Sequence, residues 1–165
     1  MSVAALEALR ARCRLSIGVP ELQQAFLHRS YVHEHADGLE SNDRLEFLGD
    51  AVIELVVREH LCGRYPTHRE GELTQRKAAL VSDDRLADNA RTLALDRCLF
   101  LGNGEEETGG RDRDSILAAA FEALTAVVFL CEGYERARRF LLEHLHLDPA
   151  SGIPGVEGHR PGAEG

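Results

Sequence analysis

Hydrophobic side chains recur at helical spacing along most of this chain, and the alternation typical of strands is nearly absent. Leu6, Leu9 and Cys13 lie on one face of a short predicted helix, and Pro20 begins a second one. The polar stretch 33–41 contains a glycine and is predicted to form a loop. The first forty residues therefore predict two short amphipathic helices followed by a connection.

The middle of the chain predicts two longer helices. The first is capped by Ser41 or Asn42 and extends to about Cys62, after which a glycine and a proline follow. The second is expected over about 70–90, where leucines and alanines recur at helical spacing. The stretch 102–110 is rich in glycine and glutamate, so we expect a turn or a mobile loop there.

The last third predicts two more helices and a tail. A long apolar helix is expected from about 114 to 131, and an amphipathic helix over 135–145. Glycine and proline then recur every few residues with few large apolar side chains, which is typical of disorder. The pattern as a whole predicts one all-α domain over residues 1–148 and a disordered tail over 149–165.

Composition agrees with a folded domain of this size. The 165 residues are 44% apolar and 28% charged, enough hydrophobic material to exclude wholesale disorder. The longest apolar run, 116–130, is shorter than the roughly 18 residues that a membrane span requires, and Glu122 and Thr125 interrupt it. We therefore expect no membrane association, and the N-terminal residues lack the pattern of an export signal.

The cysteines bear on the cellular compartment. Cys13, Cys62, Cys98 and Cys131 are widely scattered, a spacing that suits neither a zinc knuckle nor a disulfide framework. Buried free thiols in a reducing compartment are the simpler interpretation. We therefore expect a cytoplasmic protein.

Three acidic residues are the strongest candidates for chemistry. Glu46 and Asp50 are four residues apart on a predicted helix, so both project from one face among apolar neighbours. An exposed acidic edge would show the same spacing. Glu122 stands in the most apolar window of the chain, where an unpaired charge is least expected. Together the three acids favour a shared site for a hard divalent cation, and such a cluster would also contribute to the net charge of −9.

These residues also carry a resemblance to a known family. The stretch 42–51, Asn-Asp-Arg-Leu-Glu-Phe-Leu-Gly-Asp-Ala, closely resembles the signature of the ribonuclease III family. The segment 27–31, Leu-His-Arg-Ser-Tyr, and the segment 70–73, Glu-Gly-Glu-Leu, resemble the stretches on either side of that signature. The resemblance covers about 22–145 in the family's order.

The resemblance implies a fold, an activity and a set of roles. The family's catalytic domain is all-α, acts as a homodimer, and cuts both strands of double-stranded RNA with Mg²⁺, for which Mn²⁺ can substitute. By position, Glu46 and Glu122 resemble metal ligands, with Asp50 completing the metal site. Asp50 and Glu122 resemble the catalytic pair, and Glu70 resembles an accessory acid near the site. The resemblance therefore implies an endoribonuclease that acts in RNA processing.

The sequence departs from the family pattern at one ligand. Ala119 stands three residues before Glu122, where the family has a metal-binding aspartate. Losing that carboxylate should weaken metal binding by at least the roughly 10–100-fold typical of losses around a metal site. The expectation is an enzyme of reduced activity. The alternative is a catalytically inactive relative that binds structured RNA or a ribonucleoprotein.

A second departure concerns RNA affinity. Many family members carry a double-stranded-RNA-binding domain after the catalytic domain, whereas only the glycine- and proline-rich tail follows here. Phosphate contacts dominate RNA affinity, so we expect weak, salt-dependent binding or help from a partner. Arg69, Arg76 and Lys77 form the nearest basic cluster, for which a solvated helix face is an equally good interpretation.

Overall fold

The computed structural model describes residues 3–35 and 38–147, so the predicted tail at 149–165 lies outside the described residues. The expected all-α fold is confirmed, since the described residues contain no strand beyond one isolated bridge. The helices are α1 (Val3–Arg12), α2 (Val19–Gln24), α3 (Arg29–His35), α4 (Asp43–Arg64), α5 (Glu70–Leu80), α6 (Asp83–Thr92), α7 (Asn103–Glu107), α8 (Asp114–Glu132) and α9 (Tyr134–His144), with 3-10 turns η1 (Leu95–Cys98) and η2 (Gly110–Asp112).

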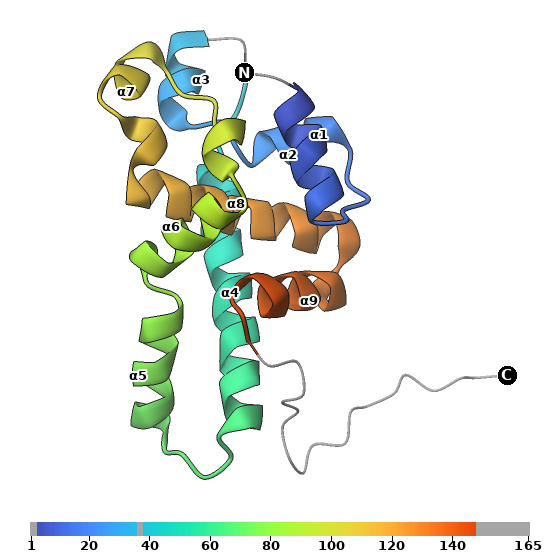
Figure 1. Ribbon diagram of the computed structural model, residues 1–165, viewed down its shortest axis with the longest axis vertical. Coiled ribbons are helices and arrows are strands. Elements are labelled where there is room, and N and C mark those ends of the chain that lie inside the picture. Colours follow the sequence, from blue (N-terminus) through green and yellow to red (C-terminus); the bar gives the residue numbers. More distant parts are fainter. Residues whose placement is uncertain (1–2, 36–37, 148–165) are drawn as a thin grey trace, which may run out of the picture.

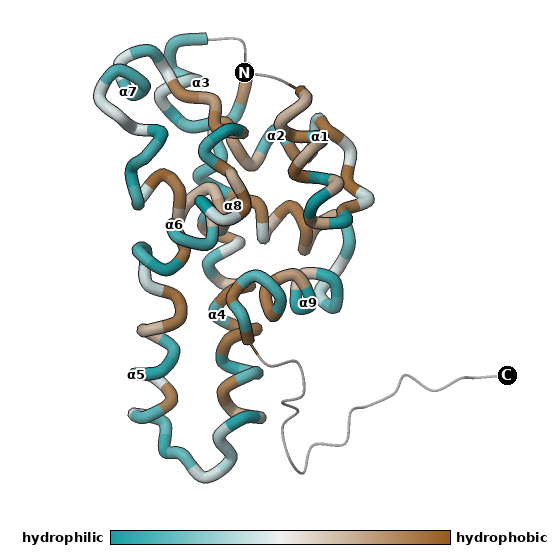
Figure 2. The backbone as a smooth tube through the Cα atoms, viewed as in Figure 1, coloured by the Kyte–Doolittle hydropathy of each residue, from teal (hydrophilic) through white to brown (hydrophobic). Residues whose placement is uncertain are grey.

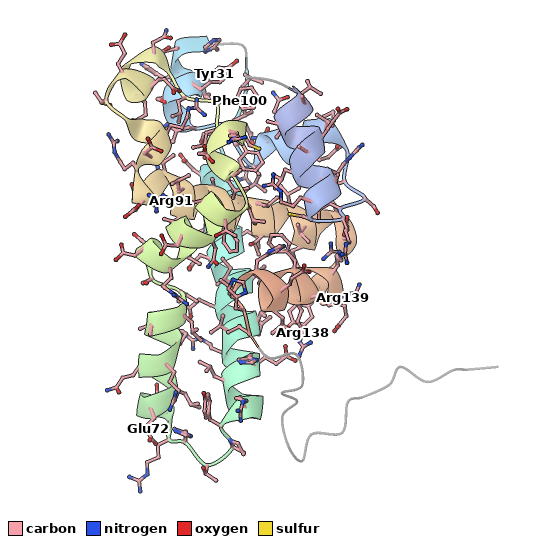
Figure 3. All side chains as sticks on the ribbon, in the orientation of Figure 1. Tyr31, Glu72, Arg91, Phe100, Arg138 and Arg139 are labelled. Atoms are coloured by element: carbon pink, nitrogen blue, oxygen red, sulfur yellow. The ribbon has the colours of Figure 1, made fainter. Side chains whose placement is uncertain are left out.

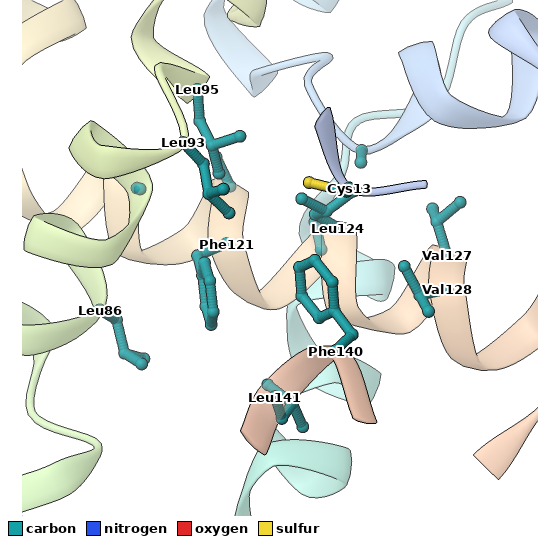
Figure 4. Packing of buried hydrophobic residues seen from close by; sticks show 14 of the residues in the cluster. Cys13, Leu86, Leu93, Leu95, Phe121, Leu124, Val127, Val128, Phe140 and Leu141 are labelled. Atoms are coloured by element: carbon teal, nitrogen blue, oxygen red, sulfur yellow. The ribbon is translucent and has the colours of Figure 1, made fainter. Parts of the chain in front are cut away.

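Two helices organise the molecule. The longest, α4, runs along the long axis, and α8 crosses it near its N-terminal half (Figure 1). The helices α6 and α9 pack against α8, which explains why α8 is apolar nearly all round. Where α8 meets α9, the rings of Phe121 and Phe140 stack with centroids 5.9 Å apart (Figure 4). The apolar window around Glu122 is therefore the central core helix.

The helix α8 lies within one residue of the predicted range of about 114–131. It has 19 residues and enough hydropathy to cross a membrane by length and composition, contrary to our expectation that no segment would qualify. However, 61% of its most apolar window is buried inside the molecule, against neighbouring helices. Its apolar character is accounted for by its place in the core.

The α4–α5 hairpin projects away from the rest of the molecule (Figure 1). In Figure 2, brown and teal segments alternate along α5, as expected for a helix with one apolar face. Leu73 and Leu80 are half-buried against the core, while α5 contributes no fully buried residue. Only one side of the hairpin is therefore covered by the protein.

Contacts between distant segments fix where α4 begins. The backbone N–H of Asn42 donates to the carbonyl of Leu27 over 2.8 Å, and its side-chain amide donates to the carbonyl of Ala25 over 2.9 Å. Leu27 also forms the isolated bridge with Phe100, whose ring meets that of Tyr31 edge-on at 5.5 Å (Figure 3). Asn42 is thus the residue before α4, as predicted, but its side chain ties the helix to α2 instead of capping it.

Three predicted segments differ from the structure. The helix α3 includes residues 33–35, which were expected in a loop, and the stretch 102–110 contains α7 and the start of η2. The single helix expected over 70–90 is two helices, α5 and α6, separated at Val81 and Ser82. Ser82 has an extended backbone with ψ 151°, which starts a new helix at Asp83 in a different direction.

The cysteines also differ in part from expectation. All four are free, as predicted, and Cys13 and Cys98 are buried. Cys62 and Cys131 are exposed, so the expectation of buried thiols is wrong for these two. Burial raises the pKa of Cys13 and Cys98 to about 11, which keeps both thiols protonated and unreactive at neutral pH.

Candidate functional site

The helices α4 and α8 touch through their backbones at Gly49. A Cβ atom built on Gly49 would lie 1.8 Å from the carbonyl oxygen of Glu122, so no larger residue fits without movement. Glu46 and Asp50 lie on α4 on either side of this contact. The crossing therefore brings the turn of α4 that carries two of the predicted acids against the turn of α8 that carries the third. We call Glu46, Asp50 and Glu122 the acid crossing.

Glu122 shows the electrostatic consequence. Its pKa is raised to about 8, chiefly because burial disfavours the charged carboxylate, and then because of repulsion from Asp50, Glu46 and Asp83. At neutral pH this carboxyl group therefore holds a proton that an ordinary glutamate would have lost. The acid crossing carries more negative charge than its surroundings can accommodate without a proton or a cation.

Glu46 is affected in the same direction. Burial is again the main cause of its raised pKa, followed by the charge of Asp43, while Arg29 acts in the opposite sense. Arg29 lies 3.3 Å from Asp43 in an ion pair that is largely exposed to solvent. This screened pair neutralises only part of the charge beside Glu46.

Two acids near the crossing were missed by sequence reasoning. Asp83 raises the pKa of both Glu46 and Glu122, although it comes from a third helix. It is the first residue of α6, so only the break between α5 and α6 directs it here. Asp43 lies within the signature stretch and begins α4. An acid in the first turn of a helix is common, so neither position carried a sequence signal of its own.

A hollow opens beside the acid crossing. It has a volume of about 340 Å³, and both Glu46 and Ala119 line it, together with Arg29 and Arg113. We call it the acid hollow. The side chain at position 119 therefore faces the same space as Glu46. The position where the family resemblance expects an aspartate is one from which a carboxylate would project into that space.

Glu70 lies elsewhere. It begins α5 at the tip of the α4–α5 hairpin, close to Glu72, which is labelled at that tip in Figure 3. The intervening helix α4 has 22 residues and is about 33 Å long, with Glu46 in its first turn. Glu70 accepts a hydrogen bond from the Thr74 hydroxyl over 2.9 Å and does not join the acid crossing within one protomer.

The basic cluster expected at Arg69, Arg76 and Lys77 is also divided in the structure. Lys77 forms an ion pair with Glu54 on α4, and both side chains are largely shielded from solvent. Arg76 instead lies over the ring of Tyr65 with its guanidinium carbon 4.2 Å from the ring centroid. Arg69 precedes α5 and is exposed. The three therefore do not form one basic patch.

Comparison with known proteins assigns this arrangement to a family. A family model described as Ribonuclease-III-like matches residues 20–148. This chain belongs to the ribonuclease-III-like family. The resemblance inferred from the signature stretch is therefore confirmed, and it covers the acid crossing, the acid hollow and the hairpin.

Several relatives of this ribonuclease-III-like chain are named ribonuclease 3. One from Desulforamulus reducens is 53% identical over 125 residues, 75% of this chain and 51% of the relative. One from Heliobacterium modesticaldum is 52% identical over 123 residues, 74% of this chain and 52% of the relative. The chain thus spans about half the length of the curated relatives it matches.

Solved structures agree on the fold. A crystal structure of the nuclease domain of ribonuclease III from Campylobacter jejuni aligns with a TM-score of 0.78 at 33% identity, covering 85% of this chain and 92% of that chain. A second structure of that domain, concerned with flexibility in a region involved in dimer formation, gives a TM-score of 0.80 at 33% identity, with 86% and 96% coverage. The predicted ribonuclease III-type helical domain is confirmed.

The donor set of this ribonuclease-III-like site suits a hard divalent cation. Its side-chain oxygens come from carboxylates, and burial together with the charges of Asp50 and Glu46 raises the pKa of Glu122. Among the residues that the structure describes, however, no three His, Cys, Asp or Glu side chains are grouped closely enough to hold an ion. The site has the right chemistry and lacks a complete, preformed ligand cluster, in keeping with Ala119 in place of a carboxylate.

Proposed function

We propose that this chain is an endoribonuclease that depends on a divalent metal and cleaves double-stranded RNA in RNA processing, with activity reduced by Ala119. The observation that carries the proposal is the acid crossing, where burial, and after it the charges of Asp50 and Glu46, raise the pKa of Glu122 at the contact of two packed helices. A structural role alone gives no reason to keep three acids at one crossing of two helices. The family membership of the chain supports the same conclusion.

In this proposal Glu46 and Glu122 hold Mg²⁺, or Mn²⁺ in its place, and Asp50 completes the site. A bound divalent ion supplies a hydroxide from water and neutralises charge on the scissile phosphate. The side chains contribute oxygen ligands, and Glu122 must give up its proton before it can bind. Metal binding should therefore strengthen as the pH rises toward the Glu122 pKa of about 8.

The experiment that tests this proposal restores the missing carboxylate. Ala119→Asp should raise the rate of cleavage of long double-stranded RNA at limiting Mg²⁺, and it should lower the Mg²⁺ concentration for half-maximal rate by at least about tenfold. The reason is that position 119 faces the acid hollow beside Glu46. Ala119→Asn is the matched control, because it adds nearly the same volume without the charge.

Equal rates for the three proteins would contradict the role given to position 119. If all of them are inert while folded, the assignment of Glu46, Asp50 and Glu122 as ligands fails.

A second function is favoured by the same substitution. A catalytically inactive protein that binds structured RNA or a ribonucleoprotein would need the fold and no metal, and the described residues lack a three-residue ligand cluster. If the natural chain is inert and Ala119→Asp cleaves RNA, this second function holds for the natural chain. The remaining acids would then be inherited from a catalytic ancestor.

We also propose that the chain forms a homodimer through one apolar face of α4 and α8. The side chain of Phe47 is 83% exposed, and Leu55 and Leu130 are more than half exposed. Phe47 and Leu55 are eight residues apart on α4 and share a helical face. A hollow of about 360 Å³ lined in part by Leu48 and Leu130 lies on the same side of the molecule.

Large exposed apolar side chains beside a hollow lined in part by leucines are typical of an interface between subunits. Glu70 is too far from the acid crossing within one protomer to act there. Its proposed role as an accessory acid therefore requires the second copy of the dimer.

A further inference from the structure

A second hollow, remote from the acid crossing, is lined by cations. It lies between the C-terminal end of α4, the second half of α5 and the residues after α9, and has a volume of about 360 Å³. Arg64, Arg76, His60 and His146 line it together with Tyr65, and its other lining residues are leucine or alanine. No carboxylate of the described residues lines it. We call it the arginine groove.

Tyr65 holds both arginines in place. The guanidinium carbon of Arg76 lies 4.2 Å from the centre of the Tyr65 ring, and that of Arg64 lies 5.6 Å from it. A guanidinium over an aromatic ring gains a cation–π interaction, and its N–H groups lie at the edges of its plane. One N–H of Arg76 donates to the Tyr65 hydroxyl over 3.5 Å, which leaves the others for a ligand. The two cations are thus positioned by a ring that does not cancel their charge.

The chain as a whole is acidic, with a net charge of −9. Neither Arg64 nor Arg76 forms an ion pair with a carboxylate of the described residues. Ion pairs do involve Arg29, Arg58, Lys77, Arg91, Arg111, Arg113, Arg136 and Arg138.

Another hollow with two arginines, near η1, differs because a backbone carbonyl already accepts from one of them. There the guanidinium of Arg12 is already engaged by the carbonyl of Leu93. The arginine groove is therefore a concave site where two arginines lie over one aromatic ring and no carboxylate of the described residues is among the lining residues. Two like charges that line one hollow favour an anionic ligand in it.

We propose that the arginine groove binds a phosphate group of duplex RNA, a contact that rests on and extends the nuclease function proposed above. Two guanidiniums match the geometry of phosphate oxygens through paired N–H···O contacts. The groove lies toward the C-terminal end of α4, about 20 Å along the helix from the acid crossing. Such a contact positions a duplex without reading its sequence.

The test measures binding of the full chain to a labelled RNA duplex in chelator, where no cleavage occurs, over a range of salt concentrations. Arg64→Gln/Arg76→Gln should weaken binding by about tenfold, as expected for lost charged contacts. The slope of log affinity against log salt should fall in magnitude by about one, because one contact between the protein and an RNA phosphate is lost. The matched control is Arg14→Gln/Arg139→Gln, which removes the same charge from exposed arginines outside the groove.

A conservative pair separates charge from geometry. Arg64→Lys/Arg76→Lys keeps both charges and loses the planar guanidinium, so it should keep most of the salt slope while recovering only part of the affinity. Unfolding curves of every variant verify that each one folds. Tyr65→Phe, which retains the ring under both arginines, should bind RNA as the unaltered chain does.

A second arm identifies the source of the phosphate. Inorganic phosphate added to the full chain should shift the NMR signals of the His60 and Tyr65 rings, whereas chloride at equal ionic strength should not, and the Arg64→Gln/Arg76→Gln chain should not respond. If phosphate shifts these signals but both glutamine variants bind RNA equally, the groove binds free phosphate and the RNA contact is overturned.

Three other outcomes are equally decisive. If neither arm distinguishes the groove variant from the control, the groove proposal fails while the nuclease proposal stands. A shift of the same signals by oligoglutamate and not by phosphate would mean an acidic peptide partner, which also overturns it. If the unaltered chain binds no duplex at all, the proposed substrate class fails as well.

Discussion

The carboxyl group of Glu122 holds its proton near neutral pH because the folded chain surrounds it with apolar side chains and with other carboxylates. In an unfolded chain the same group would titrate near its ordinary value of 4.5. The folded state therefore binds this proton more tightly than the unfolded state does. By linkage, the free energy of unfolding should fall as the pH rises from about 4.5 to about 8.

Glu122→Gln should remove this dependence. In chelator, the variant should gain stability relative to the unaltered chain between pH 4.5 and pH 9, by on the order of a few kcal/mol. Urea unfolding followed by circular dichroism at both pH values measures the difference. Glu107→Gln, at an exposed glutamate of α7, is the control and should leave the pH dependence unchanged. A variant and parent whose stabilities run parallel over this range would show that Glu122 titrates normally.

Among the individual residues of the site, the sequence identified some and not others. Glu122 was detectable because a charge in the most apolar window is unexpected, and Glu46 and Asp50 because their spacing places them on one helix face. Asp83 was not detectable, since its approach to Glu122 depends on a turn between two helices that share one continuous hydrophobic pattern. Electrostatic contacts between helices are properties of the packing, which periodicity within one helix does not contain.

Between elements, the backbone contact of α4 with α8 is the feature that places the acids. Gly49→Ala should destabilise the fold by roughly 2–4 kcal/mol, because its Cβ would collide with the carbonyl oxygen of Glu122. Denaturant unfolding gives the value. Gly71→Ala is the control: a Cβ at Gly71 meets nothing within 4 Å, so it should stabilise α5 by about 0.5–1 kcal/mol. Equal effects at the two glycines would contradict the close approach.

The order of the elements followed from the sequence more fully than their exact limits. The helices α4, α8 and α9 lie within a few residues of the predicted ranges, because each has a long apolar period and a clear end. The end of α3 (33–35) and the whole of α7 were expected in loops. Both helices are short and neither contains a buried residue, so no hydrophobic pattern in the sequence predicts them. Hydrogen bonds from Gly102 and Asn103 to Ser30 and Glu34 hold them together instead.

For the whole molecule, the exposed apolar face sets the expected state of association. Phe47→Glu should convert the proposed dimer to a monomer, because it would bury a charge in the interface, and sedimentation velocity measures the change. Val3→Glu, at an exposed apolar residue of α1, should leave the dimer intact. A natural chain that sediments as a monomer at micromolar concentration would contradict the assignment of this face.

The contact at Gly49 also limits how the sequence can drift. In a saturation library selected only for folding, position 49 should stay monomorphic, because every other amino acid brings a Cβ against the main chain of α8. Position 119 borders open space and should accept many replacements. A lineage can therefore lose or regain the carboxylate at 119 in one codon change. The packing of α4 against α8, which places that position beside Glu46, is meanwhile preserved by selection on folding alone.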